Sequence, residues 1–263
     1  MALVPINSDL HANTKFRQMT SLSFAAGTVA VPVYGNEVVA MSHEVPVVFM
    51  HDGDGFTLAA LLGLRPGQNL LVDPQGRWMG THIPAIWRRG PFRLARVEGE
   101  NDRMILCVDD SSDLLSETDG LPLFDETGAP TPLVNSITTL LTQIERDTQI
   151  MRNVCATLNR LDMIVPWNLD VTQADGTKQR VSDLYQIDEA KIATMPAESL
   201  VEIRDTGALP LIYAHLLSLS KINALGQLAR IAHDRAQQQT SVQNGNLNLD
   251  RAFGIVEDDP FLF

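Results

Sequence analysis

The sequence is poor in cysteine, in aromatic residues and in positive charge, and each scarcity excludes a class of protein. Two cysteines, Cys107 and Cys155, cannot supply a disulfide framework or a closed cysteine zinc site. With 20 basic and 32 acidic residues, the net charge of −12 argues against duplex nucleic acid or an anionic membrane as principal partner. Because 44% of the 263 residues are hydrophobic, the chain is also too apolar to be disordered. A globular protein of one large domain or two small ones remains.

Catalytic and nucleotide-binding motifs are absent as well. The sequence contains no Gly-x-Ser-x-Gly elbow, no P-loop and no dinucleotide fingerprint. Its six histidines form neither His-Glu-x-x-His nor His-x-Asp, so a zinc protease or an iron oxygenase lacks its usual local anchor. We therefore name no catalytic residue, expect no cofactor, and regard an enzyme as the less favoured class.

The start of the chain and its apolar runs bear on location. The first residues carry no basic region, and Asp9 comes before any long apolar stretch, so we expect no Sec signal peptide. The longest apolar run, residues 208–219, is interrupted by Pro210 and His215 and is too short to span a bilayer. We expect a cytoplasmic protein without a membrane span.

The last residues suggest an alternative location. They combine acidic and bulky apolar side chains, namely Asp258, Asp259, Phe261, Leu262 and Phe263. This pattern resembles the uncleaved C-terminal signal of substrates of type I exporters, which would place the protein at the cell surface or outside the cell. The other interpretation is that the two phenylalanines dock on the protein's own core or on a partner. We favour the second interpretation because such endings are short and common.

Short β-rich segments dominate residues 25–110. A first segment spans residues 29–34. Three expected hairpins follow, formed by residues 45–50 with 56–62, 69–72 with 77–79, and 92–97 with 103–108. Turn-forming residues separate the two segments of each hairpin. This pattern predicts a compact antiparallel sheet or barrel.

A helical period replaces the strand pattern after residue 130. Thr131 and Pro132 predict a helix start. Apolar residues then recur at helical spacing to about residue 162, at positions 133, 137, 140, 144, 151, 154, 158 and 161. We expect a second long helix, over residues 208–237, to pack along this one. Between them we expect a hairpin turned at Asp175-Gly176 and two short helices, over 188–194 and 197–205, the second capped by Gly207.

These patterns predict an α+β protein with a small antiparallel β-rich N-terminal half packed against a helical C-terminal half. The expected divisions are an N-terminal arm over 1–24, the β-rich half over 25–130, and the helical half over 131–237. The two halves share one core. Residues 238–263 are expected to form a polar linker and the acidic and apolar tail.

The segment His51-Asp-Gly-Asp-Gly55 has two interpretations. Asp52 and Asp54 have the spacing with which many calcium loops begin. However, the bidentate glutamate that should follow is replaced by Ala60, Leu61 and Leu62. The same residues suit a tight hairpin turn, which we favour over a metal site.

Charge is distributed unevenly along the chain. Residues 65–96 hold six arginines, no lysine and one acid, whereas residues 98–126 hold ten acids and one arginine. Arginine beside tryptophan suits planar recognition of carboxylates or phosphates. The candidate ligand-binding residues are Arg77, Trp78, Trp87, Arg88, Arg89 and His215. The favoured alternatives are that the arginines pair internally with the acidic segment and that His215 is a hydrogen-bonded core residue.

Several blocks of sequence resemble the SapC family of bacterial proteins. They occur in family-like order over roughly residues 25–230, at positions 61–70, 72–78, 83–92, 106–110, 120–125 and 207–219. The chain departs from the pattern at Gly90, where an aromatic residue is usual, and at Pro210. The resemblance implies a connection with surface-layer loci and brings no catalytic residues to carry over.

Two functions follow from these observations. The favoured one is a non-enzymatic protein that binds a protein or peptide, linked to surface-layer or outer-surface biogenesis and able to form a homo-oligomer. The alternative is an enzyme or small-anion-binding protein with its site between the β-rich and helical halves. In that alternative, Trp78, Arg88, Arg89 and His215 converge on one pocket.

Overall fold

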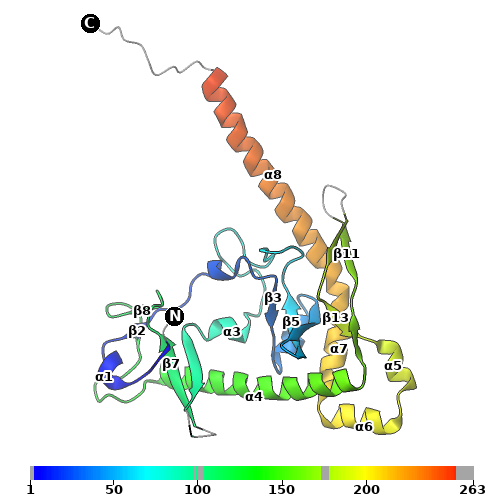
Figure 1. Cartoon of the computed structure of the whole chain (residues 1–263). Helices are drawn as coiled ribbons and strands as arrows, with labels where there is room; N and C mark the ends of the chain where they lie inside the picture. The colour runs from blue at the N-terminus through cyan, green and yellow to red at the C-terminus, as the bar shows by residue number, and fades with distance from the viewer. Residues whose placement is uncertain (1–2, 98, 100–102, 173–177, 253–263) are drawn as a thin grey trace.

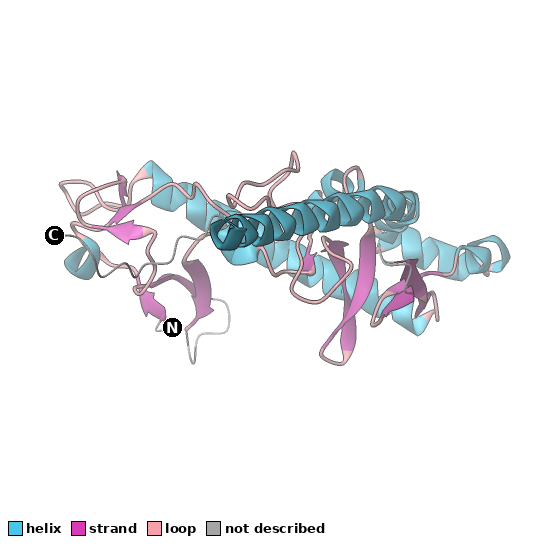
Figure 2. Ribbon diagram, turned by 90° about the horizontal axis from the view of Figure 1, so that it is seen from above, coloured by secondary structure: helices cyan, strands magenta, loops and turns pink. Residues whose placement is uncertain are grey.

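Two β units lie along one long helix in this computed structural model, which describes residues 3–97, 99, 103–172 and 178–252. The long helix is α4 (Pro132–Arg160), and the last helix, α8 (Ile222–Ala252), projects away from the body (Figure 1). The view from above shows the two β units side by side along α4 (Figure 2). Antiparallel sheets occupy the N-terminal half and most helices the C-terminal half, so the predicted α+β class is confirmed.

The first β unit is a five-stranded antiparallel sheet in the order β10-β13-β4-β5-β3. Its strands are β3 (Ala30–Pro32), β4 (Val47–Asp52), β5 (Gly55–Leu61), β10 (Ile164–Pro166) and β13 (Tyr185–Ile187). β4 and β5 form the expected hairpin, and Gly53 supplies the positive φ of 58° that its tight turn requires. Because β10 and β13 follow α4 in the chain, this sheet crosses the expected division at residue 130.

The second β unit contains two three-stranded sheets built around the N-terminus. One has the order β1-β7-β6, with β1 (Leu3–Pro5), β6 (Phe92–Arg96) and β7 (Met104–Asp109). The other has the order β8-β2-β9, with β2 (Lys15–Phe16), β8 (Leu115–Ser116) and β9 (Leu121–Pro122). A short helix, α1 (Ser8–His11), lies between β1 and β2. Within the predicted N-terminal arm, residues 1–24, β1 pairs with β7, and β2 pairs with β8 and β9.

One expected hairpin is reduced to a turn. Residues 69–79 form only an isolated bridge between Val72 and Trp78. The Asp73 carboxylate accepts the backbone N–H groups of Gln75 and Arg77, which closes a local turn instead of extending two strands. The later hairpin is formed as expected by β11 (Leu169–Thr172) and β12 (Lys178–Val181), while its predicted turn lies outside the described residues.

α4 buries a different set of residues at each end. Pro132 is its first residue, and the Thr131 hydroxyl donates to the carbonyls of Pro122 and Leu123 instead of capping the helix. The buried side chains are Val134, Ile137, Leu141, Met151, Val154, Cys155 and Leu158. The first three pack against the second β unit and the others against the five-stranded sheet. α4 therefore joins the two β units.

The expected pairing of the two long helices is wrong. The elements packed most closely along α4 are β5 and β6. The single helix predicted over 208–237 is two helices, α7 (Ala208–Ser218) and α8, separated by a 3-10 turn over Leu219–Lys221. α7 packs against α2 (Glu37–Ser42), β13 and α6 (Ala197–Asp205), because its apolar surface extends nearly all round.

The short helices complete the body. α5 (Glu189–Thr194) and α6 lie close to the predicted ranges, and Gly207 follows α6 with the left-handed φ of 75° expected of a C-cap. A 3-10 turn over Ser23–Ala25 and the helix α3 (Ala85–Arg88) were not predicted. α8 continues to Ala252, through the first part of the expected polar linker.

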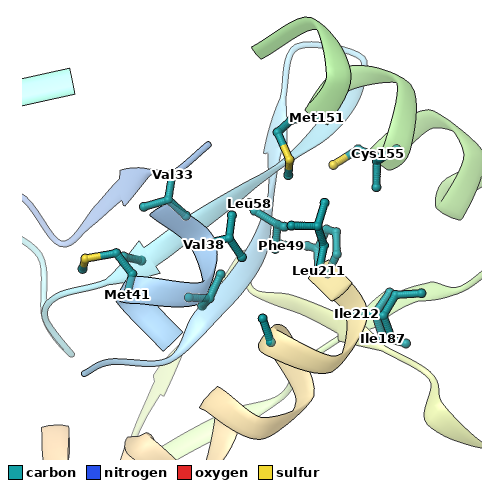
Figure 3. Packing of buried hydrophobic residues seen from close by; sticks show 14 of the residues in the cluster. Val33, Val38, Met41, Phe49, Leu58, Met151, Cys155, Ile187, Leu211 and Ile212 are labelled. Atoms are coloured by element: carbon teal, nitrogen blue, oxygen red, sulfur yellow. The ribbon is translucent and has the colours of Figure 1, made fainter. Parts of the chain in front are cut away.

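The main core contains residues from both halves of the chain. Phe49 and Leu58 of the five-stranded sheet meet Met151 of α4 and Ile212 of α7 (Figure 3). One helical stretch of the described residues, 208–238, is long and apolar enough to cross a membrane. This is weak evidence for a span, because core helices pass the same test and α7 lies in this core.

Candidate functional site: a cleft between the two β units

A cleft lies between β3 of the first β unit and the β6–β7 hairpin of the second. Its volume is about 750 Å³, within the range typical of ligand sites. Its walls come from the segment before β3, from β3, from α3 and the residues after it, and from the segment after β7. The lining residues are Met19, Ser21, Phe24, Thr28, Ala30, Val31, Pro32, Ile86, Trp87, Arg89, Gly90, Pro91, Arg93, Asp109, Ser111, Ser112, Asp113 and Leu114.

β3 presents an unpaired backbone edge to this cleft. It is an outer strand of its sheet, and its other edge pairs with β5. The bonds from Leu62 N–H to Val29 C=O and from Val33 N–H to Leu58 C=O show that the odd-numbered residues face β5. Because antiparallel strands alternate, Ala30 and Pro32 direct their backbone groups away from β5. The free groups are therefore the N–H and C=O of Ala30 and the C=O of Pro32, since proline has no N–H.

Aromatic side chains form the apolar wall. Phe24 is 65% exposed and lies edge-to-face on Trp87, with ring centroids 6.2 Å apart. Trp78 lies behind Trp87 at 5.6 Å and donates its indole N–H to the carbonyl of His82 at 3.0 Å. An exposed phenylalanine supported by two tryptophans is suited to contact apolar groups of a ligand.

Two arginines supply the positive charge of the cleft. Burial, together with repulsion from Arg93, lowers the pKa of Arg89 to about 10, so Arg89 stays charged at neutral pH. Its Nε is buried without a hydrogen-bond partner, and no carboxylate of the described chain lies within ion-pair distance of it. Arg93 Nη1 donates to the carbonyls of Gly90 and Phe92, at 2.7 and 2.6 Å, which fixes its position. Burial also lowers the pKa of Arg93, opposed by the charge of Asp109.

The acidic groups of the cleft are Asp109 and Asp113, and hydrogen bonds stabilise the charged form of Asp109. Asp109 Oδ1 accepts the Ser111 hydroxyl at 2.6 Å and the Ser111 N–H at 3.2 Å. The bond from the Ser111 hydroxyl is the main cause that lowers the pKa of Asp109. Asp113 is exposed to solvent. The cleft is thus lined by two arginines and two aspartates, and among the described residues Arg89 has no carboxylate within ion-pair distance.

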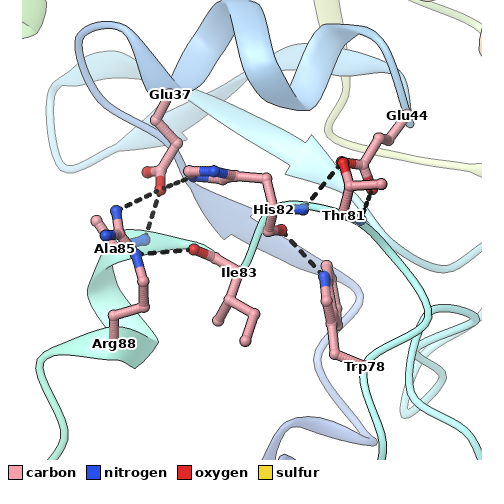
Figure 4. A network of polar contacts seen from close by, with 8 residues as sticks. All are labelled: Glu37, Glu44, Trp78, Thr81, His82, Ile83, Ala85 and Arg88. Carbon is pink, nitrogen blue, oxygen red and sulfur yellow. Dashed lines mark hydrogen bonds and ion pairs between the residues drawn. The ribbon is translucent and has the colours of Figure 1, made fainter.

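A network of carboxylates positions α3, which carries Trp87 and Arg89 into or beside the cleft. Glu37 Oε1, on α2, accepts the Ala85 N–H at 2.5 Å and contacts His82 Nε2 at 2.8 Å (Figure 4). Glu44 accepts the N–H groups of Thr81 and His82 at 2.9 and 3.0 Å, as well as the Thr81 hydroxyl. Two buried or partly buried carboxylates therefore hold the segment that leads into α3.

The six predicted ligand-binding residues do not converge. Trp87 and Arg89 line the cleft, and Trp78 supports Trp87. Arg88, next to Arg89, turns the other way: it lies 3.8 Å from Glu37 and donates to the carbonyl of Ile83 at 3.0 Å. Arg77 pairs with Asp73 at 2.7 Å in the turn described above.

His215 lies in the main core, outside any cleft. It is fully buried, donates from Nδ1 to the Val47 carbonyl at 2.7 Å, and accepts the Ile187 N–H at Nε2 at 3.1 Å. Burial lowers its pKa to about 4. It satisfies one backbone carbonyl of β4 and one backbone N–H of β13, two strands of the five-stranded sheet.

The arginine segment interacts only in part with the acidic segment 98–126. Arg96 lies 3.7 Å from Glu145 of α4, and the partners of Arg77 and Arg88 precede residue 98, so the acidic segment 98–126 supplies none of these three partners. In that segment Asp109 interacts electrostatically with Arg93.

The remaining predicted site residues are the candidate metal ligands and the residues of the C-terminal tail. Asp52 and Asp54 belong to the β4–β5 turn. Within the described ranges, no group of three or more His, Cys, Asp or Glu side chains is placed to hold a metal ion. The predicted tail residues Asp258, Asp259, Phe261, Leu262 and Phe263 lie outside the described residues.

Sequence reasoning missed the β3 edge and the two glutamates. Pro32 in a β-rich segment is a signal for an edge strand, because proline removes a ladder hydrogen bond. Glu37 and Glu44 stand out as the acids of an otherwise apolar stretch over residues 37–50. No sequence pattern showed that they contact residues 81–85.

Comparison with known proteins gives one match. The family described as SapC matches residues 6–225, from the segment before α1 to the fourth residue of α8. No curated protein matches the chain. No solved structure matches it either.

Proposed function

This chain belongs to the SapC family, and from the geometry of its cleft we propose that it is a non-enzymatic protein that binds a peptide segment of a partner protein. The segment lies along β3 and extends the five-stranded sheet by one strand. The observation that carries this proposal is the unpaired edge of β3 in the wall of a 750 Å³ cleft.

The backbone groups of β3 define how such a segment binds. A peptide that runs parallel to β3 accepts the Ala30 N–H and donates to the Ala30 carbonyl through two of its own residues, and a further peptide N–H donates to the Pro32 carbonyl. Unpaired strand edges are the usual templates for an added strand. The interaction uses main-chain atoms, so it supplies affinity without requiring one peptide sequence.

The side walls of the cleft supply selectivity. Alternate side chains of an added strand point to opposite sides. On one side they meet the aromatic wall formed by Phe24 and Trp87. This wall favours bulky apolar side chains, because their burial removes apolar surface from water.

The side chains that line the cleft support binding more than catalysis. The hydroxyl nearest to a carboxylate is Ser111, which donates to Asp109, a group that its hydrogen bonds keep ionised. Among the described lining residues there is no histidine, lysine or cysteine. The connection with surface-layer or outer-surface biogenesis, and the cellular location, stay predictions from the resemblance.

The test is a binding selection with a matched pair of variants at Ala30. Ala30→Pro removes the free N–H of the edge, while Ala30→Gly keeps the N–H and removes only the small side chain. We expect wild type and A30G to enrich the same peptides, rich in bulky apolar residues, from a library of random heptapeptides attached to beads through their N-termini. A30P should bind those peptides at least tenfold more weakly.

Two results would contradict the proposal. One is a wild-type protein that enriches no peptide. The other is an A30P variant that keeps wild-type affinity for the selected peptides. Circular dichroism of all three proteins checks that they share the same fold.

A further inference from the structure

The positive charge of the cleft is placed at one end of the β3 edge. Arg89 and the Tyr34 side chain interact electrostatically, and Tyr34 follows Pro32 by two residues. Arg89 therefore lies toward the Pro32 end of β3, and it also lines the cleft. A peptide that runs along β3 toward Pro32 meets this guanidinium.

The same end of β3 cannot continue a ladder. Pro32 has no N–H to donate, so an added strand finds no backbone donor beyond Ala30. What it finds is the guanidinium of Arg89, which lines the cleft and has no ion-pair partner among the described residues. A peptide carboxylate at this position would accept hydrogen bonds from Arg89 in place of the one that Pro32 cannot donate.

Charge complementarity points to an anion. Arg93 stands close enough to Arg89 to lower its pKa, and its Nη1 is already fixed by two carbonyls. Asp109 offsets part of the Arg93 charge. Arg89 has no ion-pair partner in the described part of the chain, and a carboxylate of the ligand would relieve the repulsion between the two guanidinium groups.

Building on the proposed function, we infer that the cleft binds the C-terminal end of its partner, with the terminal carboxylate held by Arg89 and assisted by Arg93. The preceding residues pair with Ala30 as an added strand. The last side chains lie against the wall formed by Phe24 and Trp87. The ligand class is thus a chain end with bulky apolar residues and a free carboxylate.

The experiment compares three forms of each peptide selected from the heptapeptide library. One form has a free C-terminal carboxylate, one a C-terminal amide, and one a C-terminal amide with glutamate as its last residue. Dissociation constants are measured by fluorescence anisotropy with wild-type protein. We expect the free carboxylate to bind at least tenfold more tightly than both amides.

Arginine variants then assign the contact. Arg89→Gln should weaken binding of the carboxylate form about tenfold and leave the plain amide unchanged. Arg77→Gln is the matched control, because Arg77 is an arginine outside the cleft whose side chain is 74% exposed. It should change neither form.

The outcomes separate this inference from the proposed function. Equal affinity for the carboxylate and the plain amide overturns the inference and leaves strand addition standing. Preference for the glutamate amide overturns it in favour of an internal acidic residue. If R89Q weakens binding of the carboxylate and of the plain amide equally, the role of Arg89 is overturned. If no peptide binds at all, both proposals are overturned.

Discussion

His215 is a titratable side chain that the fold keeps uncharged. Its two ring nitrogens satisfy the Val47 carbonyl and the Ile187 N–H, so β4 and β13 both depend on its neutral tautomer. Burial, only partly opposed by the bond to Val47, lowers its pKa to about 4. The unfolded chain titrates near 6.5.

This difference predicts a loss of stability on acidification. Between pH 6.5 and 4 the unfolded state binds a proton that the folded state does not, so lowering the pH favours unfolding. The contribution of neutral His215 to the free energy of unfolding is complete above pH 6.5 and is lost as the pH falls toward 4. We expect the free energy of unfolding in urea to be about 2 kcal/mol lower at pH 5 than at pH 8.

His215→Gln provides the control for this pH effect. A glutamine side chain can offer one donor and one acceptor to the same two partners, but it does not titrate. The difference between pH 8 and pH 5 should largely disappear in this variant. An equally large difference in H215Q would assign the effect to other groups.

Single residues also mark where prediction from sequence stops. Arg88 and Arg89 are neighbours at the end of α3, yet one faces Glu37 and the other lines the cleft. Because the two arginines share the same neighbours in the sequence, the sequence does not show which of them faces the cleft. The orientation of α3 decides this. Similarly, Leu140 continues the apolar spacing of α4, whereas the buried residue is Leu141.

Among the elements, α3 depends most on distant residues. It is a helix of four residues, and its start is held by the Glu37 carboxylate. So short a helix is not stable by itself. The position of Trp87 and Arg89 therefore depends on α2, which lies more than 40 residues earlier in the chain.

This dependence predicts the effect of a substitution outside the cleft. Glu37→Leu leaves the buried Ala85 N–H without its acceptor and should cost about 1–3 kcal/mol of stability. It should also weaken binding of the selected peptides, because α3 loses its anchor. Both effects are read from urea unfolding and from fluorescence anisotropy.

Glu37→Gln is the matched control, because its amide oxygen can still accept the Ala85 N–H. It should keep most of the stability and of the peptide affinity. If E37L binds the peptides as tightly as wild type, α3 does not need this anchor.

The ranges of individual elements were predicted more successfully than the elements they pack against. The hairpin of β4 and β5, the range of α4 and the C-cap at Gly207 follow from β-branched runs, helical spacing and turn residues. The partners of α4 did not follow. An amphipathic pattern shows which face of a helix is buried, but the element that covers this face is decided by the whole chain.

At the scale of the whole molecule, α4 is a common support for two β units. Its first part packs against Phe92 and Val108, and its later part against Phe49 and Leu58. The cleft lies between the two β units. The sequence prediction divided the molecule into a β-rich and a helical half and placed its alternative site between these halves, whereas this cleft lies between two β units.

The central claim is that a partner peptide extends the sheet at β3, and amide hydrogen exchange at Ala30 tests it directly. In the free protein this N–H has no partner, so it should exchange quickly, whereas the Val33 N–H, bonded to Leu58, should exchange slowly. With a selected peptide at about 100 times its Kd, exchange at Ala30 should slow about 100-fold, while exchange at Val33 changes little. A peptide that binds and leaves exchange at Ala30 unchanged would contradict the account.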